Sequence, residues 1–142
     1  MKILAIYDNG GKTWDQYTVY FDQKETEKEY YCLGMSAHPF HPLGFCQHSR
    51  GMLGRHNGKK IELKDLPIDC QVAVYKELLP LKVKPLKKLK RKYSWWRKGF
   101  AGKVYPVYKL DTLDFNLLFV AETGPNKEDY QLVYLDECQI LD

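Results

Sequence analysis

The alternation of apolar and polar positions predicts an N-terminal antiparallel sheet. Residues 2–7 are almost continuously apolar, which is typical of a strand covered on both faces. Asn9-Gly10 follows, and this dipeptide between two β-type runs indicates a hairpin. The return strand places Tyr17, Val19 and Phe21 on one face. The predicted strands are residues 2–7, 13–22, 30–35 and 59–63.

One helix is expected over residues 65–79. Asp65 is predicted to cap it, Pro67 lies in its first turn and Pro80 ends it. Its apolar residues form two opposite sides, whereas a surface helix needs only one. Leu66, Cys70, Ala73, Val74 and Leu78 make the first side; Ile68, Val72, Tyr75 and Leu79 make the second. We therefore expect both sides to be covered, by the C-terminal part or by a second subunit in a homo-oligomer.

The composition changes sharply at residues 80–93, P-L-K-V-K-P-L-K-K-L-K-R-K-Y. Beyond this segment, short β-type runs are separated by turn residues. They are residues 103–110, 115–121, 130–135 and 139–141. About five short strands in about 50 residues, with a one-turn break before the last, are typical of a small barrel. The chain is therefore expected to consist of an α+β domain (1–79), a basic connector (80–93) and an all-β barrel (94–142).

Residues 36–57, S-A-H-P-F-H-P-L-G-F-C-Q-H-S-R-G-M-L-G-R-H-N, form the most unusual stretch of the α+β domain. It contains all four histidines of the chain, two prolines and three glycines, which argues against a regular element. Its Phe40, Phe45, Met52 and Leu53 argue against disorder. The pattern predicts an ordered binding loop.

This loop offers groups that bind anions. Arginine side chains provide forked donors for phosphate or carboxylate, and Gly44, Gly51 and Gly54 would let backbone N–H groups approach an anion. Phe40 or Phe45 could stack on a base. The alternative is that the apolar residues fill the core while the polar ones are solvated. The candidate ligand-binding residues are His38, His41, Gln47, His48, Arg50, Arg55, His56 and Asn57.

The charge distribution points to a second candidate surface. Residues 82–103 hold ten Lys and Arg and no acid, whereas the rest of the chain carries 12 basic and 18 acidic side chains. Cations interleaved with tryptophans favour a phosphate backbone and its bases, or an acidic face of a partner protein. A solvated linker is the alternative, and one of Trp95 and Trp96 is expected to be buried. The candidate polyanion- or partner-binding residues are Lys84, Lys87, Lys88, Lys90, Arg91, Lys92, Trp95, Arg97 and Lys98.

Two other function classes remain open. Cys46 with His41 or His48 could form a thiolate–imidazole pair or part of a zinc site, although the spacing matches no strong signature. A structural or assembly protein using the two-sided helix is the other alternative. The pattern favours binding over catalysis, so no catalytic residue, metal ligand or cofactor is assigned.

The remaining features bear on location. Cys32, Cys46, Cys70 and Cys138 form no C-x-x-C pair and are expected to be free thiols. The apolar run at the start is far too short for a signal peptide or a membrane span. The expected location is the cytoplasm of whatever cell makes the protein, without a membrane partner.

Several separated motifs resemble a group of small, uncharacterised accessory proteins encoded in bacteriophage genomes. The motifs, all within residues 1–79, are Y-D-N-G-G-K-T (7–13), D-Q-Y-T-V (15–19), G-M-S (34–36), H-P-L-G-F-C-Q-H (41–48) and D-L-P-x-D-C (65–70). W-x-x-G-F-A-G-K-V-Y-P-V (96–107) and D-E-C-Q-I-L (136–141) resemble SH3-like barrels of phage and bacterial accessory proteins. Together they imply a phage accessory protein with an SH3-like barrel that binds a host component, with interference in host defence as its purpose.

Overall fold

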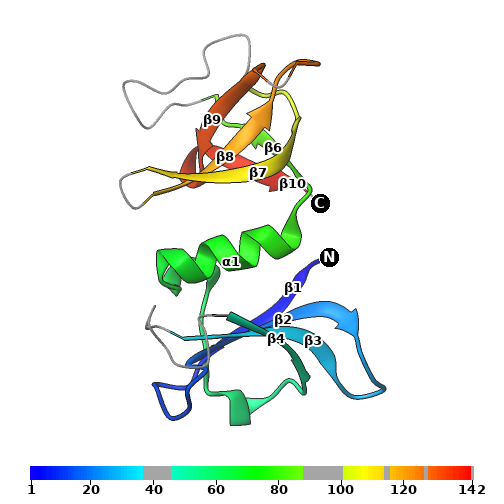
Figure 1. Ribbon diagram of the computed structural model, residues 1–142, viewed down its shortest axis with the longest axis vertical. Coiled ribbons are helices and arrows are strands. Elements are labelled where there is room, and N and C mark those ends of the chain that lie inside the picture. The colour runs from blue at the N-terminus through cyan, green and yellow to red at the C-terminus, as the bar shows by residue number, and fades with distance from the viewer. Residues whose placement is uncertain (37–45, 88–100, 114–115, 127, 142) are drawn as a thin grey trace. The chain divides into compact units, whose positions relative to one another are not determined.

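The computed structural model describes residues 1–36, 46–87, 101–113, 116–126 and 128–141 (Figure 1). The chain divides into two compact units, Met1–Val74 and Tyr75–Asp142. The boundary falls inside α1 (Ile68–Leu78), the one α-helix of the described residues. Each unit contains a five-stranded antiparallel sheet. The expected α+β class is therefore confirmed. No helix within the described part of the chain is long and apolar enough to cross a membrane.

The N-terminal sheet has the strand order β4-β3-β2-β1-β5. Its strands are β1 (Ile3–Asp8), β2 (Tyr17–Lys24), β3 (Tyr30–Met35), β4 (Cys46–Gly51) and β5 (Lys59–Lys60). The strands predicted at residues 2–7 and 30–35 are confirmed, the second to the residue. The strand predicted at residues 59–63 is shorter, because residues 63–65 turn into a 3₁₀-helix, η2 (Leu63–Asp65).

The two faces of this sheet follow the alternation of the sequence. Cross-strand pairing places Ile6, Val19 and Leu33 on one face, and the buried side chains of Tyr17 and Phe21 share it as predicted. The opposite face carries a smaller buried cluster of Tyr7, Tyr20 and Cys32, against which Ala5 and Tyr30 pack. Both faces of the central strands are therefore covered.

The predicted hairpin is confirmed, because β1 and β2 pair antiparallel, but its tight turn is wrong, because β2 begins at Tyr17 and not at residue 13. The strands are joined by residues 9–16, closed by a 2.9 Å bond from Asn9 N to Gln16 O. The Asn9 side chain organises this loop: Oδ1 accepts from Gly11 N and Lys12 N at 2.9 and 3.1 Å. Asparagine thus acts here through its side-chain acceptor, as in an Asx turn.

The expectation of an irregular loop at residues 36–57 is wrong for its second half. Residues 46–51 form β4, an edge strand paired with β3 from Tyr30↔Gly51 to Met35↔Cys46. Residues 55–57 form a 3₁₀-helix, η1 (Arg55–Asn57). An edge strand with one solvated side needs little apolar sequence, so its composition resembles a loop. Residues 37–45 lie outside the described residues.

The helix begins three residues later than predicted. Asp65 does not cap α1; its Oδ2 accepts a 2.9 Å bond from Glu62 N and thereby closes η2. Leu66 is extended (φ −71°, ψ 148°), as expected for a residue before proline. Within the N-terminal unit, Leu66, Cys70 and Val74 are buried, and Cys70 Sγ donates to the Ser36 carbonyl.

The C-terminal sheet has the order β10-β6-β7-β8-β9. Its strands are β6 (Leu81–Pro85), β7 (Tyr105–Leu113), β8 (Asn116–Glu122), β9 (Tyr130–Tyr134) and β10 (Cys138–Leu141). β6 lies within the segment 80–93 that we expected to be a connector. Its residues alternate as in a half-buried strand: Val83 and Pro85 are buried, whereas Lys82 and Lys84 are exposed.

The core of the C-terminal unit is built on β8. Phe119 is fully buried and meets Tyr75 edge-to-face, with ring centroids 5.3 Å apart. The predicted one-turn break before the last strand is a 3₁₀-helix, η3 (Leu135–Glu137), whose Glu137 carbonyl accepts from Leu86 N at 2.9 Å. Among the described strands, no pairing between β9 and β10 closes the sheet into a barrel.

Candidate anion-binding site

The structure separates the candidate residues of the loop onto the two faces of the N-terminal sheet. On β4, His48 and Arg50 lie opposite Leu33 and Tyr31. The His48 ring stacks on the ring of Tyr31, with centroids 6.0 Å apart. Arg50 Nε lies 3.7 Å from a Glu29 carboxylate oxygen, an exposed ion pair that contributes little to stability. Gln47 alternates to the other face, and His38 and His41 lie outside the described residues.

Asn57, expected to contact a ligand, instead holds η1 on the sheet. Its Oδ1 accepts a 2.7 Å hydrogen bond from the Tyr20 hydroxyl. Its Nδ2 donates to the carbonyls of Met52 and Gly54 at 2.9 and 3.0 Å. These three bonds use both amide hydrogens and the amide oxygen. Asn57 is therefore a structural residue beneath the site, while the neighbouring Arg55 and His56 are exposed.

The glycines of this segment allow close packing. A Cβ on Gly51 would lie 2.8 Å from the Tyr20 hydroxyl. The Gly54 N–H, which we expected to approach an anion, donates to the Tyr7 hydroxyl at 3.2 Å. Gly58 has φ +110°, and a Cβ there would overlap the Asp8 carbonyl. Glycine at these positions brings the segment 51–58 against β1 and β2.

A pocket of about 630 Å³ lies where η1, β1 and β5 meet. We call it the cationic pocket. Its lining residues are Leu4, Ala5, Tyr7, Leu53, Gly54, Arg55, Gly58, Lys59 and Lys60. Lys60 pairs with Tyr7 across β5 and β1, which sets the two side chains on the same face of the sheet. The pocket thus combines an apolar side with three cations.

No carboxylate lines this pocket among the described residues, although Lys59 pairs with Asp8 across β5 and β1. None of the lining residues is acidic, and Arg55, Lys59 and Lys60 form no ion pair with another described residue. Arg55 and Lys60, which form no ion pair among the described residues, raise the local potential and favour an anionic ligand. Of the candidate ligand-binding residues that the structure describes, Arg55 lines this pocket, together with Leu53 and Gly54 of the same predicted loop.

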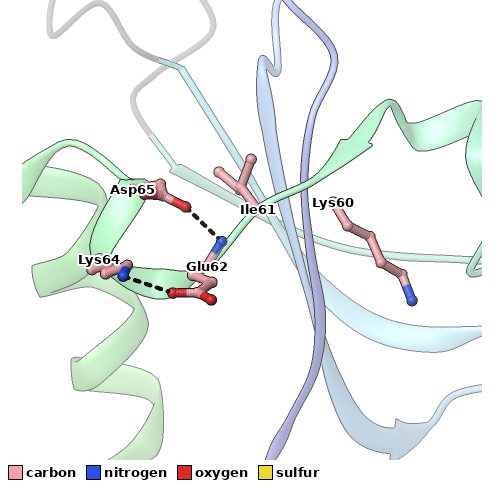
Figure 2. Close-up of a pocket in the computed structure, with 5 residues that line it drawn as sticks. All are labelled: Lys60, Ile61, Glu62, Lys64 and Asp65. Atoms are coloured by element: carbon pink, nitrogen blue, oxygen red, sulfur yellow. Dashed lines mark hydrogen bonds and ion pairs between the residues drawn. The ribbon is translucent and has the colours of Figure 1, made fainter.

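Two other concavities of the described chain differ from it in charge. Figure 2 shows a shallow pocket of about 460 Å³ in which Glu62 binds Lys64 at 3.2 Å and Asp65 accepts from the Glu62 N–H. The Lys60 side chain points away from this group (Figure 2). The third, in the C-terminal unit, is lined by Asp111 and Glu122 as well as a lysine. Carboxylates in both pockets disfavour an anion.

The basic segment is described only in part. Lys84 is exposed on β6 and Lys87 is exposed just beyond it. Neither forms an ion pair within the described part of the chain. The other predicted contacts lie outside the described residues: Lys88, Lys90, Arg91, Lys92, Trp95, Arg97 and Lys98. The same is true of Trp96.

The thiols are placed for packing. Cys32, Cys70 and Cys138 form no disulfide bond within the described residues, and Cys32 and Cys70 are buried. Burial, with Asp15 and Glu29 nearby, raises the pKa of Cys32 to about 11. Burial, with Asp136 and Glu137 nearby, raises that of Cys138 to about 12. Across the described residues, no three His, Cys, Asp or Glu side chains gather in a group that could hold a metal. The Cys46 side chain and His41 lie outside the description.

Sequence reasoning missed most of the cationic pocket. Lys59 and Lys60 follow Arg55 within the run R-H-N-G-K-K, and that spacing is the one signal in the sequence that could have found them. Leu4 and Tyr7 come from a strand more than 45 residues earlier and carry no such signal. The assignment rests on the residues of this chain: comparison with models of protein families, with curated proteins and with solved structures finds no match.

Proposed function

We propose that this protein is a non-enzymatic, phage-type accessory protein that binds nucleic acid of the host, free or within a nucleoprotein complex, through exposed cations. The observation that carries the proposal is the cationic pocket. There Arg55, Lys59 and Lys60 surround one concavity without a carboxylate in its lining. The phage motifs in residues 1–79 support the accessory role and the interference with host defence.

The C-terminal unit supplies the second part of the proposed contact. Val83 and Pro85 of β6 are buried, so Lys82 and Lys84 face solvent together, and Lys87 follows. The acid-free sequence continues to Lys103 and contains two adjacent tryptophans. Single-stranded nucleic acid suits this composition, because lysines track the backbone and aromatic rings stack on bases.

We further propose that the C-terminal unit is an SH3-like domain. Two observations support this. Its first strand, β6, pairs with both β7 and the last strand, β10. A 3₁₀-helix, η3, separates β9 from β10. This order of five strands, with a single turn before the last, is that of SH3-like barrels.

Salt dependence of binding tests the function. A fluorescently labelled single-stranded oligonucleotide is titrated with the protein at salt concentrations from about 50 to 300 mM, and anisotropy gives the affinity. We expect the logarithm of the association constant to fall linearly with the logarithm of salt, by roughly 0.7 per phosphate neutralised. The double variant Lys82→Ala/Lys84→Ala should therefore reduce the slope by roughly 1.4.

A matched variant controls for net charge. Lys12→Ala/Lys28→Ala removes two exposed lysines from turns of the N-terminal unit and should leave the slope unchanged. No binding at low salt, or an equal effect of the two double variants, would contradict the proposal. Displacement of the oligonucleotide by polyglutamate as readily as by unlabelled oligonucleotide would instead indicate an acidic protein partner.

A further inference from the structure

We infer that the cationic pocket is a nucleotide site: it takes a phosphate group together with the nucleoside attached to it. The ligand is either a free mononucleotide or the phosphorylated end of a strand. This inference rests on the proposed function and names the ligand of one of its contact surfaces. It is carried by three features of the pocket: its cations, a buried phenol and an apolar side.

The cations favour phosphate over a carboxylate. Arg55, Lys59 and Lys60 lie within six residues of sequence and line the same concavity. A phosphate monoester carries about −1.5 to −2 charges and several acceptor oxygens, whereas a carboxylate carries a single charge. Arginine binds two phosphate oxygens with its fork, and the lysines act as mobile point charges. Arg55 and Lys60, the latter on the same face of the sheet as Tyr7, match the larger charge.

Tyr7 provides a donor that the protein itself does not use. Its side chain lines the pocket and is only 3% exposed. The hydroxyl oxygen accepts from Gly54 N at 3.2 Å, and its hydrogen meets no acceptor among the described residues. Tyr20, whose ring packs edge-to-face on that of Tyr7, donates its own hydroxyl hydrogen to Asn57. A buried donor without an acceptor requires an explanation, and a phosphate oxygen in the pocket supplies one.

The apolar side suits a nucleoside. Leu4 and Leu53 line the pocket from two segments, and they are 42% and 40% exposed. Two leucines exposed around one concavity can cover the faces of a base, as apolar side chains do in other base pockets. The volume of about 630 Å³ is within the range of small-molecule sites, roughly 300–1,000 Å³.

The geometry is fixed before a ligand arrives. Asn57 ties η1 to Tyr20, and Gly54 N binds Tyr7. The amide of Gly58 donates to the Arg55 carbonyl at 3.0 Å, and the glycine itself packs on Asp8. Arg55 therefore projects from an anchored backbone, which lowers the entropy lost on binding.

Calorimetric titration with adenosine monophosphate, adenosine and inorganic phosphate tests the inference. We expect the nucleotide to bind at least about tenfold more tightly than either half alone, because it satisfies the cations and the apolar side together. Arg55→Ala/Lys60→Ala should lower its affinity more than about tenfold, and Tyr7→Phe about fivefold. Lys28→Ala is the control and should bind normally. Circular dichroism melts establish that each variant is folded.

A second titration distinguishes the two sources of the ligand. Oligonucleotides with a 5′-phosphate or a 5′-hydroxyl are compared on the full chain. Tighter binding of the phosphorylated strand, lost in Arg55→Ala/Lys60→Ala, identifies a strand end. Equal binding of the two strands, with mononucleotide binding retained, identifies a free nucleotide.

Two results would overturn the inference: no nucleotide binding at millimolar concentration, or the same nucleotide affinity in the folded double variant. If salt-dependent binding of single strands persisted in that case, the pocket assignment alone would be wrong. If the mononucleotide bound while single strands did not bind at low salt, the proposed function alone would be wrong.

Discussion

The hydroxyl of Tyr20 donates a 2.7 Å hydrogen bond to Oδ1 of Asn57, joining the centre of the N-terminal sheet to a 3₁₀-turn 37 residues later. Asn57 also binds two carbonyls of its own segment. This one amide therefore fixes the backbone from which Arg55 projects.

Asn57→Ala should destabilise the fold and weaken the site together. Loss of three hydrogen bonds, two of them partly buried, should lower the free energy of unfolding by about 2–3 kcal/mol, as measured by urea denaturation. Anion affinity should fall because Arg55 loses its support. Asn126→Ala, at an exposed turn position, is the matched control and should change neither quantity. Wild-type stability of Asn57→Ala would contradict this role.

Gly58→Ala tests the close approach of the segment 51–58 to β1. A Cβ at this position would overlap the Asp8 carbonyl and lie 2.7 Å from Asn9 Cα. Since the contact is with backbone, we expect a loss of more than about 3 kcal/mol in the free energy of unfolding. Gly10→Ala is the control, because Gly10 also has positive φ (+74°) but open space around it. It should cost only about 1 kcal/mol, and equal losses would show that φ alone matters.

Stability should fall in alkaline solution. Burial raises the pKa of Tyr20 to about 12, and burial together with Cys138 raises that of Tyr75 to about 12, from an ordinary value of 10.0. A raised pKa in the folded state means that folding favours the protonated phenol. This contribution is complete below about pH 10 and is lost as the pH rises through 12.

Urea denaturation between pH 8 and pH 11.5 should therefore show a decline that begins near pH 10. Tyr75→Phe removes one of the responsible phenols and should make the decline shallower. A curve that stays flat over this range, or an unaltered decline in Tyr75→Phe, would contradict the assignment.

The described thiols should react slowly with alkylating agents. With a pKa of about 11 for Cys32 and about 12 for Cys138, only a small fraction of either is thiolate at pH 8. Iodoacetamide, followed by peptide mass spectrometry, should modify both far more slowly than free cysteine. Modification should become rapid in urea. Rapid labelling of the folded protein would mean that these thiols are accessible.

Local alternation made part of the fold predictable. Ile6, Val19 and Leu33 share a face because apolar residues recur at every second position, and β3 was predicted to the residue. The lysines of β6 concealed the same signal. In L-K-V-K-P the apolar residues recur at every second position, as in a strand. Because Lys82 and Lys84 alternate with the buried Val83, the segment was predicted to be a basic connector.

The candidate site was less predictable because tertiary contacts create it. Arg55 was selected for its chemistry and does line the cationic pocket. Asn57 was selected for the same reason, yet its hydrogen bonds are used within the fold. Leu4 and Tyr7 reach the pocket through the pairing of β1 with β5, which no property of residues 3–8 reveals. The composition of the pocket therefore depends on the pairing of strands that are far apart in the sequence.

The position of α1 has a consequence for how the chain can be divided. Val74 and Tyr75 are adjacent in one helix but belong to different compact units. Dividing the chain between these two residues would leave each fragment with only one or two turns of α1, too short to stay helical by itself. Separate expression of the halves therefore requires that both fragments keep residues 68–78, and a duplicated helix is the practical way to obtain them.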